Sequence, residues 1–353
     1  MDNIYIAMSG GVDSGTSAYL IKQQHPNANI VGITMNLGDF CTGAISKAKR
    51  ICDWLGIEHR VLDLREPFQA EIINKFHNQI INNITPIPCA SCNRQFKFGR
   101  VLEYCRKNNA KLATGHYAKK VEINGQTRIT RARDTLKDQT HFIYNIRATA
   151  LPNILFPLGD YLKAEVFRLA TEIGLPYLNS QNQYNESQDV CFFGGKTYAE
   201  YLKAMHLTDE NCKTGDVLHI STGKHLGEHK GLLKYTIGQR QGLGIAWTEP
   251  LYVVKKDMQN NILYVGEEPT LYTNSLQITG VNFLVEPAAL LDNQNSFDCQ
   301  VCLRDKTPLI DAKINVDGTN AEVHLNQPAR AITPGQACVF YRGNVLLGGG
   351  EIK

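Results

Sequence analysis

Two cysteines three residues apart, Cys89 and Cys92, stand in the stretch ITPIPCASCNRQFKFG, directly after two prolines. A pair with this spacing can hold a metal, form a disulfide or supply a nucleophile. Cys92 is followed by Asn93 and Arg94, where the sequence predicts that a helix begins. A thiol at a helix N-terminus and near basic side chains has a lowered pKa and is a thiolate at neutral pH. We therefore predict that Cys92 is a reactive thiolate, in preference to a buried and inert cysteine.

A second pair, Cys299 and Cys302, lies in the segment CQVC. Zinc ribbons place two such pairs about 15–20 residues apart, whereas these two pairs fall in different predicted domains. On a strand, residues three apart face opposite sides, so Cys299 and Cys302 do not converge. We predict that both pack as small apolar side chains and that no four-cysteine zinc site forms.

Cys191 stands in a third setting, NESQDVCFFGGK, which predicts a loop between polar residues and a Gly-Gly turn. Two interpretations of this cysteine stay open. Its thiol can be reactive like that of Cys92, or it can belong to an anchor that Phe192 and Phe193 make for the loop.

The segment AMSGGVDSG, residues 7–15, follows the first predicted strand and opens the first predicted helix. We expect Gly10 and Gly11 to take positive φ and to let the backbone approach a ligand closely. Asp13 or Ser14 can cap the helix, whose free N–H groups favour an anion. Neither G-x-x-x-x-G-K-[ST] nor G-x-G-x-x-G is matched. The alternative is a Gly-Gly turn before a capped helix, with no ligand.

The order of elements predicts the fold. Apolar strand-like runs alternate with amphipathic helical segments, which indicates a parallel, doubly wound α/β sheet. From about residue 197 the chain changes to short alternating runs with turn dipeptides, and its last part is a series of strands. We predict an α/β domain, a small β-rich central domain and a C-terminal β-barrel, at residues 1–196, 197–274 and 275–353.

Composition agrees with a folded protein. Of the 353 residues 43% are hydrophobic, enough for ordinary cores. The net charge of +3 and the pI of about 8.2 allow nucleic-acid binding only through a local basic surface. The first residues lack the features of a signal peptide, and no apolar run reaches about 18 residues. We expect a cytoplasmic protein with no membrane span and with most of its ten thiols free.

Ser-Gly-Gly-x-Asp-Ser after the first strand resembles the pyrophosphate loop of the N-type ATP pyrophosphatases, whose fold is adenine nucleotide α hydrolase-like. These enzymes split ATP between the α and β phosphates with the help of Mg2+. A closer resemblance covers nearly the whole chain. The chain resembles the bacterial-type tRNA-specific 2-thiouridylases through seven motifs in order: SGGVDS, PCASCNRQFKFG, LATGHYAK, KDQTHF, SQDVCF, YTIGQRQGLGI and PARAITPGQACVFY.

This resemblance implies an enzyme that carries out ATP-dependent 2-thiolation of the wobble uridine, position 34, of tRNA. The uridine O2 is adenylated, and sulfur then replaces it. Cys191 receives the sulfur as a persulfide from an upstream sulfur carrier or cysteine desulfurase, and Cys92 is the paired nucleophile. A transient Cys92–Cys191 disulfide is then reduced. The implied ATP-binding residues are Ala7, Met8, Ser9, Gly10, Gly11, Val12, Asp13, Ser14, Met35 and Gly115.

The resemblance also implies tRNA contacts and partners. The implied substrates are the tRNAs for Glu, Gln and Lys, whose target base leaves its stack to react. The enzyme is expected to be a monomer. Basic stretches at residues 128–137 and 224–234 are either solvated faces or phosphate contacts. The implied tRNA-binding residues are Ile87, Pro88, Cys89, His116, Lys137, Asp138, Gln139, Arg304, Asp305 and Gln336.

The chain departs from the family pattern in two functional motifs. Ile87-Pro88-Cys89 stands where the family usually has Asn-Pro-Asp, so the role of that aspartate does not carry over. Asp305 replaces the usual tyrosine after Arg304. A smaller departure is Gly15, where a second serine is common.

Cys89 opens an alternative mechanism. With Cys92 and Cys191 it makes three thiols that can hold a [4Fe–4S] cluster, as in some related RNA thiolases. The other interpretation leaves Cys89 as a spectator and assigns no certain metal site. Two further alternatives are an ATP pyrophosphatase-type synthetase that does not thiolate and a tRNA-binding protein with an inactive synthetase domain. The intact SGGVDS motif and the cysteines argue against both.

Overall fold

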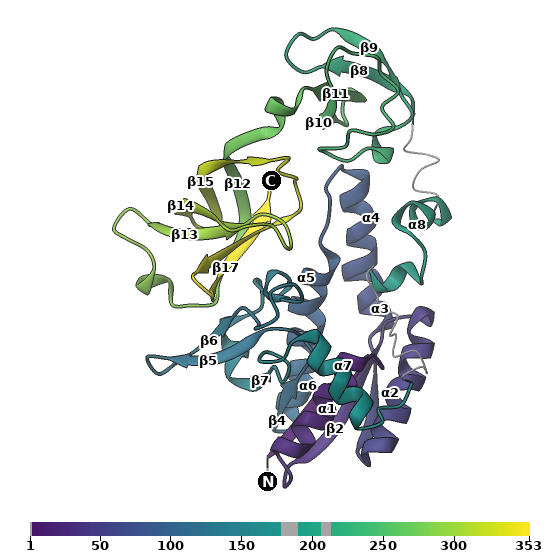
Figure 1. The fold of residues 1–353 in the computed structure, drawn as a ribbon, viewed down its shortest axis with the longest axis vertical. Coiled ribbons are helices and arrows are strands. Elements are labelled where there is room, and N and C mark those ends of the chain that lie inside the picture. Colours follow the sequence, from purple (N-terminus) through teal and green to yellow (C-terminus); the bar gives the residue numbers. More distant parts are fainter. Residues whose placement is uncertain (1, 178–189, 206–212) are drawn as a thin grey trace.

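The computed structural model describes residues 2–177, 190–205 and 213–353. They form an N-terminal α/β part, a barrel beside it, and a small β-rich part beyond the end of a long helix (Figure 1). None of the helices in these ranges is long and apolar enough to cross a membrane. The predicted domain boundaries, after residues 196 and 274, stay predictions.

A five-stranded parallel sheet forms the centre of the N-terminal part. Its strands are β1 (Asn3–Ala7), β2 (Asn29–Asn36), β3 (Glu58–Asp63), β4 (Ala110–Ala113) and β7 (Ile154–Leu155). Their order is β3-β2-β1-β4-β7, with every pairing parallel. The order therefore reverses beside β1, and ligands of such sheets bind at the carboxyl ends of the strands at that point. The predicted doubly wound sheet is confirmed.

The side chains of β1 alternate between the two faces of the sheet and so contribute to two separate cores. Ile4 and Ile6 pack with the helices α1 (Val12–Gln24), α2 (Thr42–Leu55) and α7 (Lys163–Glu172) on one face of the sheet. Tyr5 points to the other face and packs with residues of α6 (Leu102–Lys107). Successive side chains of a strand face opposite sides, so one strand supports both layers. Gly56, with a φ of 65°, forms the C-cap of α2.

Two helical segments connect β3 with β4. One consists of α3 (Arg65–Phe68), η2 (Gln69–Ile73) and α4 (Asn74–Ile81), and α4 reaches toward the central part (Figure 1). The other consists of α5 (Pro88–Cys92), η3 (Asn93–Val101) and α6. It begins at Pro88, which suits the first helical turn because proline has no N–H to lose there.

Six antiparallel strands close into the C-terminal barrel, since β12 pairs with both β15 and β17. Cys299 faces the barrel interior, whereas Cys302 packs in the core shared with the N-terminal part, so their predicted opposite orientation is confirmed. The strands are β12 (Tyr272–Phe283), β13 (Ser296–Cys302), β14 (Ile310–Asp317), β15 (Asn320–Arg330), β16 (Ala337–Arg342) and β17 (Val345–Ile352).

The barrel is fixed to the N-terminal part by strand pairing and by a shared core. The hairpin β5 (Lys119–Ile123) and β6 (Gln126–Thr130) joins the barrel sheet through a pairing of Val345 with Thr130. Leu346 and Tyr341 of the barrel lie in the same apolar cluster as Tyr5. These contacts hold the barrel loops over the edge of the α/β part.

The central part contains a four-stranded sheet in the order β10-β11-β8-β9. Val217, Val253 and Leu263 form its apolar core. The helix α8 (Tyr198–Ala204) precedes it and packs against Phe76 and Phe192. The strands are β8 (Gly215–His219), β9 (His225–His229), β10 (Tyr252–Asp257) and β11 (Ile262–Gly266).

Candidate active site

The loop after β1 turns back on itself through serine hydroxyls. Ser14 Oγ donates to the Gly11 carbonyl at 3.0 Å, and the Ser9 and Ser14 hydroxyl oxygens are 3.2 Å apart. Gly11 is the N-cap of α1, and no side chain caps that helix. The predicted cap by Asp13 or Ser14 is therefore wrong, because both residues lie inside the first turn.

Only one of the two loop glycines takes the predicted backbone conformation. Gly10 has a φ of 75°, and a Cβ atom there would come within 2.7 Å of the Ala44 carbonyl oxygen. Gly11 has a φ of −89°, so its predicted positive φ is wrong. The close packing of Gly10 on α2 leaves no room for a side chain.

A cavity of about 230 Å³ opens behind this loop, between the ends of β1 and β4. Gly115 lies so close to the loop that its Cβ would meet the Ser14 nitrogen at 3.0 Å. Of the predicted ATP-binding residues, seven lie in the wall, while Gly10 and Gly11 stand in the loop beside it and Val12 begins α1. The seven are Ala7, Met8, Ser9, Asp13, Ser14, Met35 and Gly115.

Further residues of the cavity wall were not among the predicted ATP-binding positions. Lys97 of η3 supplies a positive charge, and Gln139 supplies an amide. His116 also lines the cavity, although the resemblance implied a tRNA contact for it. It is buried, and its Nδ1 lies 2.8 Å from the Thr114 hydroxyl. Burial and the charge of Lys97 hold its pKa well below the usual range, so the ring is neutral.

Asp13 has two partners that the sequence did not suggest. Lys163 Nζ donates to its carboxylate oxygens at 2.7 and 2.8 Å, and the Tyr117 hydroxyl donates to Oδ1 at 3.0 Å. Lys163 begins α7, and Tyr117 follows β4. Their sequence separation from Asp13 explains why the chain alone gives no signal for them.

Four thiols lie close enough together to influence one another's pKa. Those of Cys89 and Cys41 act on both Cys92 and Cys191. All four cysteines are free in the structure. Cys41 and Cys92 pack against the same apolar cluster, which includes Phe192. The structure thus brings together the three predicted thiols, and it adds Cys41, which follows β2 and which sequence reasoning missed.

The predicted thiolate character of Cys92 is wrong for this structure. The helix begins at Pro88, so Cys92 stands one turn inside it instead of at its N-terminus. Burial raises the pKa of its thiol to about 11, and the opposing charge of Lys97 does not outweigh that desolvation. The thiol is neutral at pH 7 and needs a base or a change of surroundings to react.

The structure supports the anchor interpretation of the segment around Cys191, whereas the reactivity of its thiol stays a prediction. Phe192 and Phe193 are buried and hold the short helix η6 (Cys191–Phe193) against α4 and α8, while Cys191 itself is exposed. The surrounding protein still raises the pKa of its thiol to about 12, with the thiols of Cys92 and Cys89 adding to the effect. The polar residues 187–189 of the predicted motif lie outside the described residues.

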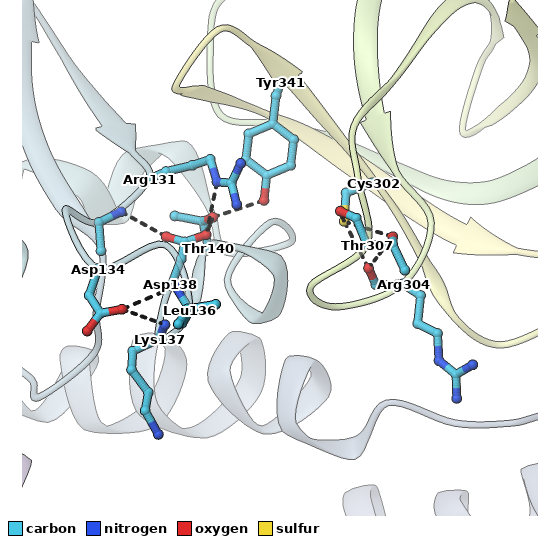
Figure 2. Close-up of polar contacts among 11 residues, drawn as sticks. Arg131, Asp134, Leu136, Lys137, Asp138, Thr140, Cys302, Arg304, Thr307 and Tyr341 are labelled. Atoms are coloured by element: carbon cyan, nitrogen blue, oxygen red, sulfur yellow. Dashed lines mark hydrogen bonds and ion pairs between the residues drawn. The ribbon is translucent and has the colours of Figure 1, made fainter. Parts of the chain in front are cut away.

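Polar contacts fix the loop between β6 and η4 (Thr140–Phe142), where tRNA contacts were implied (Figure 2). The carboxylate of Asp138 is buried, and it accepts from the Ala132 nitrogen at 2.8 Å and from the Thr140 hydroxyl at 2.5 Å. It also lies 3.4 Å from Arg131 Nε. Asp138 therefore stabilises its own loop from inside. The side chain of Lys137 points away from these contacts in Figure 2.

The implied tRNA contacts of the barrel lie beside that loop. The Thr140 hydroxyl is 2.9 Å from the Tyr341 hydroxyl, which joins the loop to the barrel. Arg304 is exposed, and Figure 2 shows its side chain leaving the turn that Cys302 and Thr307 support. Asp305 is half-buried, and burial raises the pKa of its carboxyl.

The loop that leads into α5 is tied to the barrel. Gln336 Nε2 donates to the Thr85 carbonyl at 2.9 Å. Ile87 is half-buried and Pro88 is buried, whereas Cys89 is exposed. Of these four implied tRNA contacts, Cys89 thus offers the most open surface.

The described residues do not form a ready metal site. Across residues 2–177, 190–205 and 213–353, no group of three or more histidine, cysteine or acidic side chains is arranged to hold a metal ion. The three thiols of the cluster alternative are therefore near one another without forming a ligand set.

Comparisons with known proteins agree with this architecture. The family models match the chain as a tRNA methyl transferase HUP domain over residues 2–195, a tRNA methyl transferase PRC-barrel domain over 204–267 and an aminomethyltransferase beta-barrel domain over 273–352. The tRNA-specific 2-thiouridylase MnmA of Pelobacter propionicus is 39% identical over 99% of this chain and 97% of its own length. The chain belongs to the tRNA-specific 2-thiouridylase family.

A second 2-thiouridylase, from Rickettsia typhi, is 37% identical over 100% of this chain and 99% of its own length. The resemblance to the 2-thiouridylases that the motifs carried is thereby confirmed. Among solved structures, the U34-tRNA thiolase NcsA of Methanococcus maripaludis with its [4Fe-4S] cluster matches with a TM-score of 0.36 and 19% identity, over 60% of this chain and 67% of its own. NMN synthetase of Francisella tularensis matches with a TM-score of 0.35 and 15% identity, over 59% and 74%.

Proposed function

We propose that this protein uses ATP to replace the O2 of the wobble uridine, position 34 of tRNA, by sulfur. Lys97 is the observation that carries the proposal. Its side chain lines the cavity behind the phosphate loop, and its charge acts on the thiols of Cys92 and Cys191. The nucleotide site and the pair of thiols therefore lie near one basic group, and a two-step adenylation and sulfur transfer needs the two sites close together.

In the first step the uridine O2 attacks the α phosphorus of ATP. The new O–P bond forms as the bond to the β phosphate breaks, and pyrophosphate leaves. Ser9, Ser14 and the backbone of the loop hold the phosphates, as N–H groups at a helix start favour anions. Mg2+, when bound, would offset the charge of the leaving pyrophosphate. Mg2+ is usually held by phosphates together with carboxylates, and the carboxylate in this cavity wall, Asp13, is already paired with Lys163.

In the second step a persulfide on Cys191 attacks C2 of the adenylated base, and AMP leaves. Cys92 then attacks the sulfur of Cys191, which breaks the persulfide bond and leaves 2-thiouridine in the tRNA. The product on the protein is a Cys92–Cys191 disulfide, which an external thiol reduces. Sulfur carrier proteins and cysteine desulfurases are the donors that would load Cys191 again.

Further features of the proposal follow from the family. The substrates are the tRNAs for Glu, Gln and Lys, bound by a monomer. Arg304 is exposed near the junction between the α/β part and the barrel, where it can meet a phosphate, and the half-buried Lys137 lies on the neighbouring loop. A disulfide formed in each turnover needs a reducing compartment, so we place the reaction in the cytoplasm.

The cluster mechanism remains the second candidate, because Cys89, Cys92 and Cys191 share one neighbourhood. We derive no step through a cluster, since the described residues do not form a ligand set. Anaerobic purification, iron analysis and the visible spectrum distinguish the two mechanisms. An absorbance band near ~400 nm that disappears together with the iron and the activity would favour the cluster.

Pyrophosphate release and 2-thiouridine formation, measured on the same sample, test the proposal. We expect tRNA to stimulate release from ATP and 2-thiouridine to appear when a persulfide donor is present. Pyrophosphate release without any 2-thiouridine would instead indicate a synthetase that does not thiolate. If tRNA binds and neither product forms, the protein is a tRNA-binding protein with an inactive synthetase domain.

A further inference from the structure

We propose that Lys163 is a positioning residue that neutralises and orients Asp13, so that the phosphate loop can accept ATP. This inference rests on the proposed function, because it assigns ATP to the cavity behind the loop. Lys163 Nζ is 2.7 Å and 2.8 Å from the two carboxylate oxygens of Asp13, so the ammonium group spans the carboxylate.

The ammonium group is enclosed on the side away from the loop. The Lys163 side chain is 11% exposed, whereas that of Asp13 is 35% exposed. Lys163 Nζ lies 4.9 Å from the ring centre of Phe167 and 5.7 Å from that of Tyr117. The Tyr117 hydroxyl donates to the same carboxylate at 3.0 Å. Two donors from different elements thus hold Asp13 in one orientation.

The backbone of Lys163 is itself fixed. Its nitrogen donates to Asp134 Oδ2 at 2.8 Å, and Asp134 Oδ1 accepts from the nitrogens of Leu136 and Lys137, both at 3.1 Å. Figure 2 shows these contacts of Asp134 with the segment that carries Lys137. The lysine therefore belongs to a rigid frame around the loop, and a lysine in such a frame needs little reorganisation when a ligand binds.

The charge balance at the loop gives Lys163 its role. The triphosphate of ATP is strongly anionic, and Asp13 lies in the wall of the cavity that would receive it. A carboxylate without a partner would repel that anion. Lys163 cancels this charge from behind, and it is not among the residues that line the cavity, so it acts through Asp13 rather than on the phosphates.

Equilibrium binding of α,β-methylene-ATP with Mg2+, without tRNA, tests this role. We expect Lys163→Met to weaken binding by about tenfold or more, since a charge loses its partner beside an anionic ligand. Lys163→Arg keeps the charge and should stay within about threefold of the unmodified protein. Lys49→Met is the matched control, because Lys49 pairs with Asp53 on the exposed surface of α2 and should leave binding unchanged.

A double substitution distinguishes this role from general damage to the fold. If Lys163 acts through Asp13, adding Asp13→Asn to Lys163→Met removes the uncompensated charge and restores binding to the level of Asp13→Asn alone. Thermal melts report which variants fold. If Lys163→Met does not fold, the Lys163→Gln variant, alone and with Asp13→Asn, makes the same comparison.

The result that overturns the inference is a Lys163 variant that folds and binds the analogue as the unmodified protein does. Additive losses in the double variant would overturn it as well. Failure of the unmodified protein to bind the analogue would instead contradict the proposed function, so the two failures are distinguishable.

Discussion

Gly115 packs directly on the backbone of Asp13, and a Cβ atom on Gly115 would lie 3.0 Å from the Asp13 carbonyl carbon. The loop after β4 and the phosphate loop after β1 therefore approach as closely as a missing side chain allows. We predict that Gly115→Ala moves the phosphate loop and weakens ATP binding by about tenfold or more, because small displacements of positioning groups have large effects.

Titration of the protein with α,β-methylene-ATP checks this prediction. Gly43→Ala is the matched control, since nothing lies within 4 Å of a Cβ built on Gly43 in α2. Equal affinity in the Gly115 and Gly43 variants would mean that the contact between the two loops has no part in nucleotide binding.

The second prediction concerns the thiols. We expect Cys92→Ser and Cys191→Ser each to lower 2-thiouridine formation by at least about 10³-fold, the scale seen when a nucleophile is removed. Both variants should still bind the ATP analogue, because neither cysteine lines the nucleotide cavity. Mass spectrometry of digested tRNA measures the modified nucleoside.

Cys89→Ser separates the two mechanisms of sulfur transfer. Cys89 is the exposed member of its C-x-x-C pair, and the persulfide mechanism gives it no step. We therefore expect this variant to keep most of its thiolation activity. Loss of activity together with loss of bound iron would support the cluster mechanism instead.

The reactivity of Cys92 should depend on pH in a defined direction. Burial raises the pKa of its thiol to about 11, so the thiolate fraction rises about tenfold per pH unit below that value. The rate of alkylation by iodoacetamide should accordingly increase from pH 7 to pH 10 in the folded protein. In urea the pKa is ordinary, so the rate should level off above about pH 8.5. A plateau below pH 9 in the folded protein would contradict the burial of the thiol.

The fifth prediction tests the junction between the α/β part and the barrel. Arg304→Ala should weaken tRNA binding and reduce the slope of log affinity against log salt by about 1, as loss of one phosphate contact does. Arg168→Ala is the control, because Arg168 forms an exposed ion pair with Glu172 on α7. An equal effect of both substitutions would show that Arg304 contributes only to net charge.

The fold and the site residues differ in how much the sequence revealed. The strands that frame the site and the loop SGGVDS have local signatures, so the parallel sheet and the position of the phosphate loop could be predicted from periodicity and motif. Asp138 illustrates the limit. Its motif indicated a tRNA contact, yet its carboxylate is buried in hydrogen bonds within its own loop.

The residues that sequence reasoning missed act across large distances in the chain. Lys163 lies 150 residues from Asp13, and Cys41 is on a different element from Cys92. The pKa of Cys92 was predicted in the wrong direction for a related reason. The basic neighbours along the chain are visible in the sequence, whereas burial depends on the apolar cluster that the folded chain builds around the thiol.

Single-turnover transfer from the loaded protein tests the central claim most directly. The protein would be loaded with a labelled persulfide on Cys191, freed of donor, and mixed with ATP and tRNA for glutamate. The proposed mechanism predicts one labelled 2-thiouridine at the wobble position for each persulfide lost, with an equal amount of Cys92–Cys191 disulfide. Transfer that leaves the Cys191 persulfide intact, or labelled protein that yields no 2-thiouridine, would contradict it.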